Sequence, residues 1–254
     1  DIKSMEKYDL HCHLDGSLSE SCIRRLAEEA GISLDGCQLE KELRAEEDCK
    51  SLAEYLTKFD LPLRCLTSEK SFTEAVKDVM KTAAQEHVVY LEIRFAPMLS
   101  VTENLTANKI IEAAIKGLKE GENLYGVKGN LILCGMRHQP VELNTKLAEI
   151  AADYHGYGVC ALDLAGDEAA FPVKQQAEMF RKAIAEFGGM GKFVKAGQKV
   201  VVKPNIGWDK VPELAGNTNP ELVSEIIKQC FDAGAKEVVV FDHTCDDWRK
   251  CYKN

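Results

Sequence analysis

The chain has 254 residues, of which 45% are hydrophobic and 29% charged, a balance typical of a globular protein and not of a disordered one. The formal charge of −9 disfavours nucleic acid as a partner, and no apolar run approaches the ~20 residues of a membrane-spanning helix. The ten cysteines form no Cys-x-x-Cys pair, and the polar start from Asp1 to Glu6 lacks the apolar core of a secretory signal. We therefore expect a cytoplasmic protein that contacts neither nucleic acid nor membrane.

The first three quarters of the chain alternate between strand and helix patterns. Runs rich in β-branched, aromatic and other apolar residues predict four strands, over residues 8–14, 88–95, 130–134 and 158–164. Apolar residues spaced by three and four predict helices over residues 20–30, 51–59, 72–87, 107–120, 141–154 and 174–187. Gly121 is expected to close the helix over 107–120. Near-continuous apolar strands alternating with helices favour an α/β fold with a parallel, barrel-like sheet, and an open doubly wound sheet is the second choice.

The pattern changes after Phe187. The glycine-rich stretch 188–192 follows a helix and precedes a strand, which is the wrong order for a phosphate-binding loop, and Phe193 replaces the required Ser or Thr. Strands are expected over 199–204 and 237–241, with a helix over 219–233 between them. About six β units are too few for the eight of a closed TIM barrel, so we expect an incomplete one.

His11 and His13 lie two residues apart on the first predicted strand. Side chains at that spacing point to the same face, so both imidazoles can reach one ion about 2 Å away. Zn²⁺ suits imidazole ligands, and a catalytic zinc keeps one position for water. The spacing alone favours a surface or core pair of histidines without a metal, and the metal site is the alternative at this point.

Four motifs in chain order resemble those of adenosine deaminases. The stretch 8–18, Tyr-Asp-Leu-His-Cys-His-Leu-Asp-Gly-Ser-Leu, resembles the first strand of that family, and 89–97 resembles its second. Cys-Gly-Met-Arg-His at 134–138 and Asp-Leu-Ala-Gly-Asp-Glu at 163–168 resemble the third and fourth. The similarity runs over about residues 7–187 and implies a TIM-barrel amidohydrolase with a Zn²⁺ cofactor, which deaminates adenosine hydrolytically to inosine and ammonia.

The resemblance also assigns roles to individual residues. It implies that His11 and His13 bind zinc, that His13 also faces the substrate, and that Asp15 hydrogen-bonds the ribose of a purine nucleoside. Gly166 is implied to lie against the purine, where the missing side chain lets a flat base approach. A helix cap at Asp15 and a turn at Gly166 are the ordinary structural alternatives, and each is compatible with ligand binding.

Other residues near these motifs have a less specific interpretation. Phe59 and residues 61–63 predict either an apolar lid or ordinary packing at a helix end. Arg94, His138 and Glu168 stand at strand ends, where charges more often anchor loops, so we assign none of them as catalytic.

The sequence departs from the family pattern after residue 187. The family continues with a His-Ala-Gly-Glu strand, whose histidine is a further zinc ligand and whose glutamate shuttles the proton, and later with a histidine and an Asp-Asp pair. These motifs do not occur in the sequence at the corresponding places, so activity is expected to be impaired and no catalytic residue is assigned. His243 with Cys245, Asp246 and Asp247 is a minor alternative source of metal ligands.

The carboxyl-terminal part resembles the opening of a domain family of unknown function that is sometimes linked to iron-sulfur proteins. The resemblance rests on residues 193–197, 203–209, 217–221 and 241–245. We therefore predict a deaminase-like half-barrel over 1–187, joined to an α/β segment of that second family over 188–254. Two alternatives follow. One is a non-catalytic nucleoside-binding or metal-binding remnant, assembled as a homo-oligomer that covers its sheet edges. The other is a redox or iron-sulfur accessory protein, although the spacing of His243, Cys245 and Cys251 fits no standard ferredoxin run.

Overall fold

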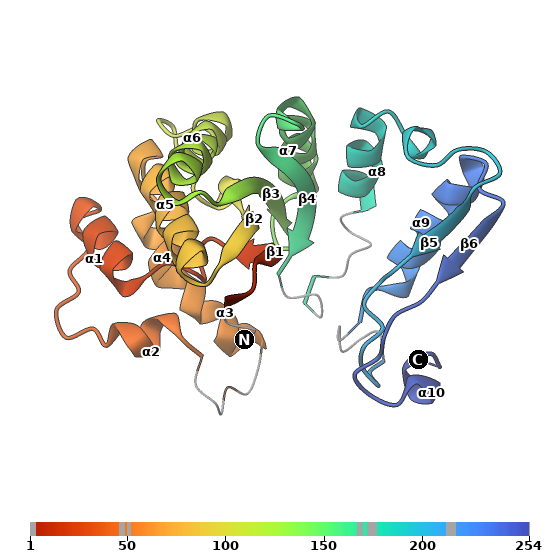
Figure 1. Cartoon of the computed structure of the whole chain (residues 1–254), viewed down its shortest axis with the longest axis horizontal. Coiled ribbons are helices and arrows are strands. Elements are labelled where there is room, and N and C mark those ends of the chain that lie inside the picture. Colours follow the sequence, from red (N-terminus) through yellow and green to blue (C-terminus); the bar gives the residue numbers. More distant parts are fainter. Residues whose placement is uncertain are drawn as a thin grey trace. The chain divides into compact units, whose positions relative to one another are not determined.

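The computed structural model describes residues 4–45, 49, 52–166, 170–171, 177–211 and 217–253. These residues form two compact units, drawn in Figure 1. The first comprises Asp1–Gly135 and Asp153–Leu164, and the second Met136–Ala152 and Ala165–Asn254. No helix in the part of the chain that the structure describes has the length and apolar character needed to cross a membrane.

Strands alternate with helices as far as the fourth strand. In chain order the elements are β1 Lys7–His13, α1 Glu20–Glu29, α2 Leu39–Leu43, α3 Leu52–Leu56, η2 Thr57–Phe59, α4 Asp60–Cys65, α5 Glu69–Gln85, β2 Val88–Phe95, η3 Pro97–Leu99, α6 Ala107–Tyr125, β3 Lys128–Met136, α7 Val141–Tyr154 and β4 Val159–Ala165. The strands form one sheet in the order β1-β2-β3-β4, and the β1–β2 and β2–β3 pairs are parallel. This order follows the chain, as it does in a barrel.

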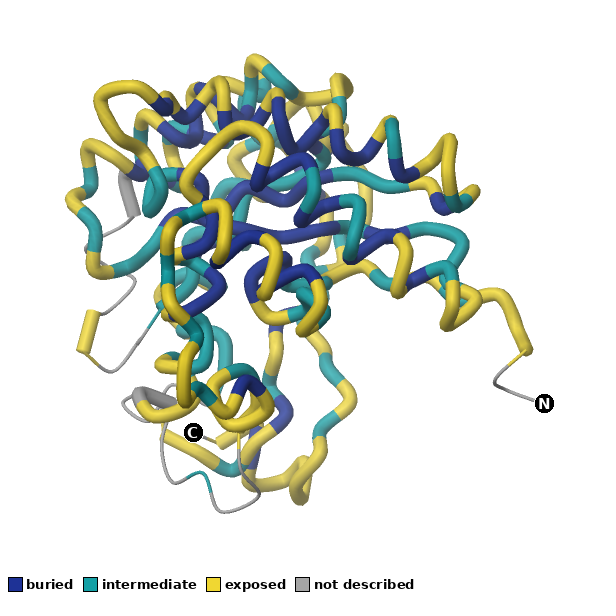
Figure 2. The backbone as a smooth tube through the Cα atoms, turned by 90° about the vertical axis from the view of Figure 1, so that its left-hand side faces the viewer, coloured by how far each residue is buried: buried dark blue, intermediate teal, exposed yellow. Residues whose placement is uncertain are grey.

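The main core lies between this sheet and the helices that cover it. Leu91 and Ile93 of β2 and Leu131 and Leu133 of β3 are almost fully buried. Figure 2 shows the buried stretches gathered along the strands, with exposed residues on the outer turns of the helices. Burial on this scale, about 25 cal/mol for each Å² of apolar surface, is the main stabilising contribution to such a sheet.

Helices α5 and α6 approach closely because α6 carries glycines at the contact. A β-carbon at Gly117 would lie 2.8 Å from the carbonyl oxygen of Thr73, and one at Gly121 would lie within contact of the Met80 sulfur. The prediction that α6 ends at Gly121 is therefore wrong, because this glycine provides room for packing. The helix continues to Tyr125 and ends at Gly126, whose positive φ of 74° suits a glycine cap.

The loop between β1 and α1 is fastened to α5. The Ser19 backbone N–H donates to Asp78 Oδ2 at 2.8 Å, and its hydroxyl donates to Asp78 Oδ1 at 2.9 Å. The same hydroxyl accepts from the Cys22 N–H at 3.2 Å and caps α1. The helix cap is therefore Ser19 and not Asp15, which leaves the Asp15 side chain available for another role.

The second unit carries a small parallel β-α-β arrangement. Its later elements are α8 Ala177–Glu186, η5 Met190–Lys192, β5 Lys199–Val202, α9 Pro220–Asp232, β6 Glu237–Val240 and α10 Trp248–Cys251. Strands β5 and β6 pair in parallel with each other, joined through α9. Val194, Cys230 and Ala235 form the buried centre of a small core against which Val200 and Val238 pack.

The α/β class and the alternation of strands with helices are confirmed, and all six predicted strands are present. They do not form one sheet among the described residues, because β5 and β6 pair only with each other. Each of these strands has four residues, and α9 supplies the crossover that parallel pairing requires. The predicted boundary between residues 187 and 188 stays a prediction.

Candidate functional site

The two histidines of β1 lie side by side at its carboxyl end. The ring centroids of His11 and His13 are 5.3 Å apart, and their planes are tilted by 54°. The β1–β2 register shifts between Asp9 and Cys12, where the His11 N–H donates to Asp9 Oδ1 at 3.1 Å. His11 is exposed and His13 is partly buried, so the first ring is open to solvent and the second belongs to a more enclosed site.

Arg94 of β2 lies at the centre of this site and is only 5% exposed. Its Nε donates to Asp163 Oδ2 at 2.8 Å, and its Nη1 lies 3.1 Å from Nδ1 of His13. Its Nη2 donates to the Cys134 sulfur at 2.6 Å, and the Cys134 thiol donates in turn to the Gly135 carbonyl at 3.1 Å. One guanidinium therefore contacts a side chain from each of the other three strands of the sheet.

The electrostatics of the cluster follow from burial and from this cation. Burial, then Arg94 and then His11 lower the pKa of His13 from 6.5 to about 4, which keeps the imidazole neutral at neutral pH. Burial opposes ionisation of Asp163, but the hydrogen bond and charge of Arg94 outweigh it and lower the pKa of that carboxyl. Burial raises the pKa of Cys134 to about 12, so the sulfur stays a thiol.

Asp15 is a buried carboxyl in the loop that follows β1. It is 8% exposed, and its Oδ1 has no hydrogen-bond partner among the described residues. Burial raises its pKa, although Arg94 and backbone N–H groups act in the opposite direction. A buried acceptor without a partner costs free energy, so this oxygen has a strong tendency to accept a hydrogen bond from a ligand.

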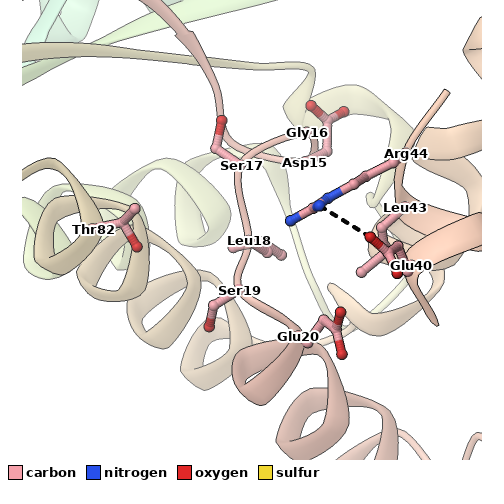
Figure 3. A pocket seen from close by; sticks show the side chains of 10 residues that line it. All are labelled: Asp15, Gly16, Ser17, Leu18, Ser19, Glu20, Glu40, Leu43, Arg44 and Thr82. Carbon is pink, nitrogen blue, oxygen red and sulfur yellow. Dashed lines mark hydrogen bonds and ion pairs between the residues drawn. The ribbon is translucent and has the colours of Figure 1, made fainter. Parts of the chain in front are cut away.

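A pocket of about 280 Å³ opens beside Asp15 (Figure 3). Its lining consists of Asp15, Gly16, Ser17, Leu18, Ser19, Glu20, Glu40, Leu43, Arg44 and Thr82. Arg44 extends across it and donates to Glu40 at 3.3 Å, and both of these side chains are largely exposed. Three carboxylates and one guanidinium give the lining a net negative charge, which disfavours an anionic ligand.

The residues proposed as a lid have two different environments. Phe59 packs against the site: its ring centroid lies 5.8 Å from that of His13, and a β-carbon at Gly16 would lie 3.0 Å from its ring. Leu61 and Pro62 are buried in α4 and act as core residues. Phe59 therefore forms an apolar wall next to His13, and α4 packs as an ordinary helix.

The other predicted site residues lie outside the first unit. Gly166 follows β4 in the second unit, with a φ of 114° that only glycine adopts readily, and a β-carbon placed there would lie 3.6 Å from Arg137. The ring of His138 lies 6.2 Å from that of Phe171. Glu168 lies outside the described residues.

A catalytic zinc centre takes three protein ligands and leaves one position for water. Among the described residues, no three His, Cys, Asp or Glu side chains gather closely enough to hold a metal ion. In the second unit, Asp246 and Asp247 accept backbone N–H groups of Asp209 and Arg249. His11 and His13 supply two imidazoles, and Nδ1 of His13 already faces a cation. The described residues thus do not fit a complete zinc centre.

Sequence reasoning did not identify the central role of Arg94 or its partners Cys134 and Asp163. A signal was present, because Arg94 stands between Ile93 and Phe95, and an arginine inside an apolar strand needs a partner. Asp163, near the carboxyl end of β4, has the opposite charge to Arg94, near the carboxyl end of β2. The identity of the pair, however, depends on tertiary contacts.

The fold defines an α/β protein with a parallel sheet whose strands end in polar side chains. The sequence model of the adenosine deaminase family matches residues 6–215, and the chain belongs to that family. A second family, described as a domain of unknown function (DUF362), matches residues 200–254. The chain therefore has the two-part architecture expected from its motifs.

Individual relatives agree with this assignment. An adenosine deaminase of Enterococcus faecalis is 40% identical over 173 residues, which are 67% of this chain and 51% of the relative. The chain thus spans about half the length of that relative. Arabidopsis ADAL in complex with GMP is 25% identical, with a TM-score of 0.62 over 72% of this chain and 56% of that one. A zinc-bound amidohydrolase of Burkholderia ambifaria shares the fold, at 14% identity and a TM-score of 0.63 over 79% of this chain and 53% of that one.

Proposed function

We propose that the first unit binds a purine nucleoside at the carboxyl end of β1. The reaction to which this site is adapted is the zinc-dependent hydrolytic deamination of adenosine to inosine and ammonia, and we propose that turnover is strongly impaired in this chain. The observation that carries the proposal is the buried Asp15 carboxyl, whose Oδ1 has no described partner and which lies two residues after His13 in the loop that follows β1.

The described side chains account for binding better than for catalysis. Asp15 supplies an acceptor for a ribose hydroxyl, and Phe59 supplies an apolar surface next to His13. Deamination also needs an activated water and a proton donor to the purine ring. Two imidazoles offer Zn²⁺ fewer donors than a catalytic centre uses, so we expect weak zinc binding. The His-Ala-Gly-Glu segment that carries the family's proton shuttle does not occur in the sequence.

The charge of the pocket favours a nucleoside over a nucleotide. ADAL, one of the solved neighbours, was crystallised with GMP, so a nucleoside monophosphate is the second candidate ligand. In this chain Asp15, Glu20 and Glu40 line the pocket with Arg44 as the one arginine or lysine among its lining residues. A phosphate would meet more negative than positive charge there, whereas a ribose hydroxyl can donate to a carboxylate.

Calorimetric titration with adenosine, inosine and AMP tests the proposal. We expect adenosine to bind more tightly than AMP, and Asp15→Asn to weaken adenosine binding by about tenfold, the effect of losing one hydrogen bond to a charged group. Asp35→Asn, which changes an exposed aspartate, is the matched control and should leave affinity unchanged. Absence of adenosine binding, or an equal affinity in Asp15→Asn, would contradict the proposal.

The catalytic half of the proposal is tested separately. Elemental analysis should find zinc well below one equivalent after dialysis, and an adenosine deamination assay should find turnover far below the ~10 s⁻¹ typical of enzymes. Tightly held stoichiometric zinc with ordinary turnover would show that the site is complete and would contradict the proposal that turnover is impaired.

A further inference from the structure

We infer that Arg94, and not a metal ion, holds His13 in this chain, and that His13 serves as a hydrogen-bond acceptor. Arg94 is then a positioning residue that ties together the carboxyl ends of all four strands. This inference concerns the state of the imidazole ring, and it stands or falls independently of nucleoside binding.

The direction of the hydrogen bond between Arg94 and His13 fixes the position of the ring proton. Arginine carries only donors and does not lose its proton in proteins. The 3.1 Å contact between Arg94 Nη1 and His13 Nδ1 therefore requires that Nδ1 presents a lone pair. The proton of the neutral ring must then lie on Nε2.

This arrangement is the reverse of the one that metal sites use. A histidine that binds a metal through one nitrogen donates its other N–H to a carboxylate, carbonyl or water. If zinc bound Nε2 of His13, the proton would move to Nδ1 and point at an N–H group of Arg94. If zinc bound Nδ1, it would meet the guanidinium cation directly. His13 can become a zinc ligand only after Arg94 moves away.

Arg94 cannot move away from His13 without losing its other hydrogen bonds. Its remaining donors bind Asp163 on β4 at 2.8 Å and Cys134 on β3 at 2.6 Å, while Arg94 itself belongs to β2 and His13 to β1. Displacement would leave a guanidinium that is 5% exposed without its partners. The network therefore favours the arrangement in which Arg94 stays and His13 accepts.

Nitrogen-15 NMR of the wild-type protein gives a direct test. Long-range correlations from the ring protons distinguish protonated from unprotonated ring nitrogens, and His13→Gln assigns the signals of His13. At pH 7 we expect Nε2 protonated and Nδ1 unprotonated, with His13 signals unmoved by one equivalent of ZnCl₂ or by EDTA. A proton on Nδ1, or His13 signals that shift with zinc, would overturn the inference.

Removing the N–H donors of Arg94 should leave Nδ1 of His13 without its hydrogen bond and allow the ring to bind zinc. In Arg94→Met, which keeps an unbranched apolar side chain, zinc should shift the His13 signals and bind about tenfold more tightly than in the wild type, as expected when an interaction in the shell around a metal changes. Arg64→Met removes an exposed arginine and should leave both readouts at wild-type values. Unchanged zinc affinity in folded Arg94→Met would count against the inference, and if that variant does not fold, the wild-type spectrum decides.

Discussion

Acidification should destabilise this protein through His13. Burial, Arg94 and His11 hold the pKa of this imidazole at about 4 in the folded chain, against 6.5 ordinarily. Between those values the unfolded chain binds a proton that the folded chain does not, so stability falls as the pH is lowered from 6.5 towards 4. Above pH 7 the ring is neutral in both states, and this contribution is fully present.

The size of the effect follows from the same two values. The difference between 6.5 and about 4, at 1.36 kcal/mol for each pH unit, sets an upper limit of about 3.4 kcal/mol. Because His13 is only partly buried, solvent screening reduces the expected loss to ~1–2 kcal/mol at pH 4.5.

Urea unfolding at pH 7.5, 6.5, 5.5 and 4.5, in the presence of EDTA, measures this loss. Wild type and His13→Gln should lose different amounts of stability over this range, with the wild type losing ~1–2 kcal/mol more. Other titrating carboxyls, Asp15 and Asp163 among them, are common to both proteins and largely cancel in the comparison. A constant difference in unfolding free energy between the two proteins from pH 7.5 to 4.5 would show that His13 does not have a lowered pKa in the folded chain.

Three further substitutions test the packing and the site. Gly117→Ala should lower the free energy of unfolding by ~2 kcal/mol, because the clash of the new β-carbon with the Thr73 carbonyl outweighs a helix-propensity gain of ~1 kcal/mol. The control Asn123→Ala, at an exposed position of the same helix, should be neutral or slightly stabilising. Asn144→Ala should cost ~3 kcal/mol, since this fully buried amide pairs with both the N–H and the carbonyl of Met136 in β3; a loss below ~1 kcal/mol would contradict this role. Asp15→Asn should stabilise the fold by ~1 kcal/mol at pH 7 by removing a buried charge, and a clear loss of stability would show that the carboxylate is satisfied in the folded protein.

Local sequence patterns were sufficient to predict most elements of this chain. The apolar, β-branched run of β2 and the helical spacing of α7 each predicted the observed ends. The predicted end of α6 at Gly121 was wrong. A glycine in a helical pattern indicates either the end of the helix or a close contact with another helix, and here the contact with Met80 decides between them. Met80 lies 41 residues before Gly121 in the sequence, so the local pattern around Gly121 gives no indication of this contact.

The pairing between elements was harder to predict from the sequence than the elements themselves. Nothing in the pattern of β5 and β6 distinguishes strands that extend a larger sheet from strands that pair only with each other. His13, Arg94, Cys134 and Asp163 belong to four different strands, and their proximity was not predicted from the sequence. Which group donates to which depends on side-chain geometry, so the role of Arg94 emerged only from the structure.

The two buried charges of the site differ in how they are compensated, and this difference bears on function. The guanidinium of Arg94 has three partners within 3.1 Å, so its desolvation is offset inside the fold. The carboxyl of Asp15 retains one oxygen without a described partner, and the fold carries that cost. A charge that is satisfied internally contributes to structure, whereas an uncompensated one gains most from a ligand. The same contrast explains why we assign ligand binding to Asp15 and positioning to Arg94, although both side chains are buried.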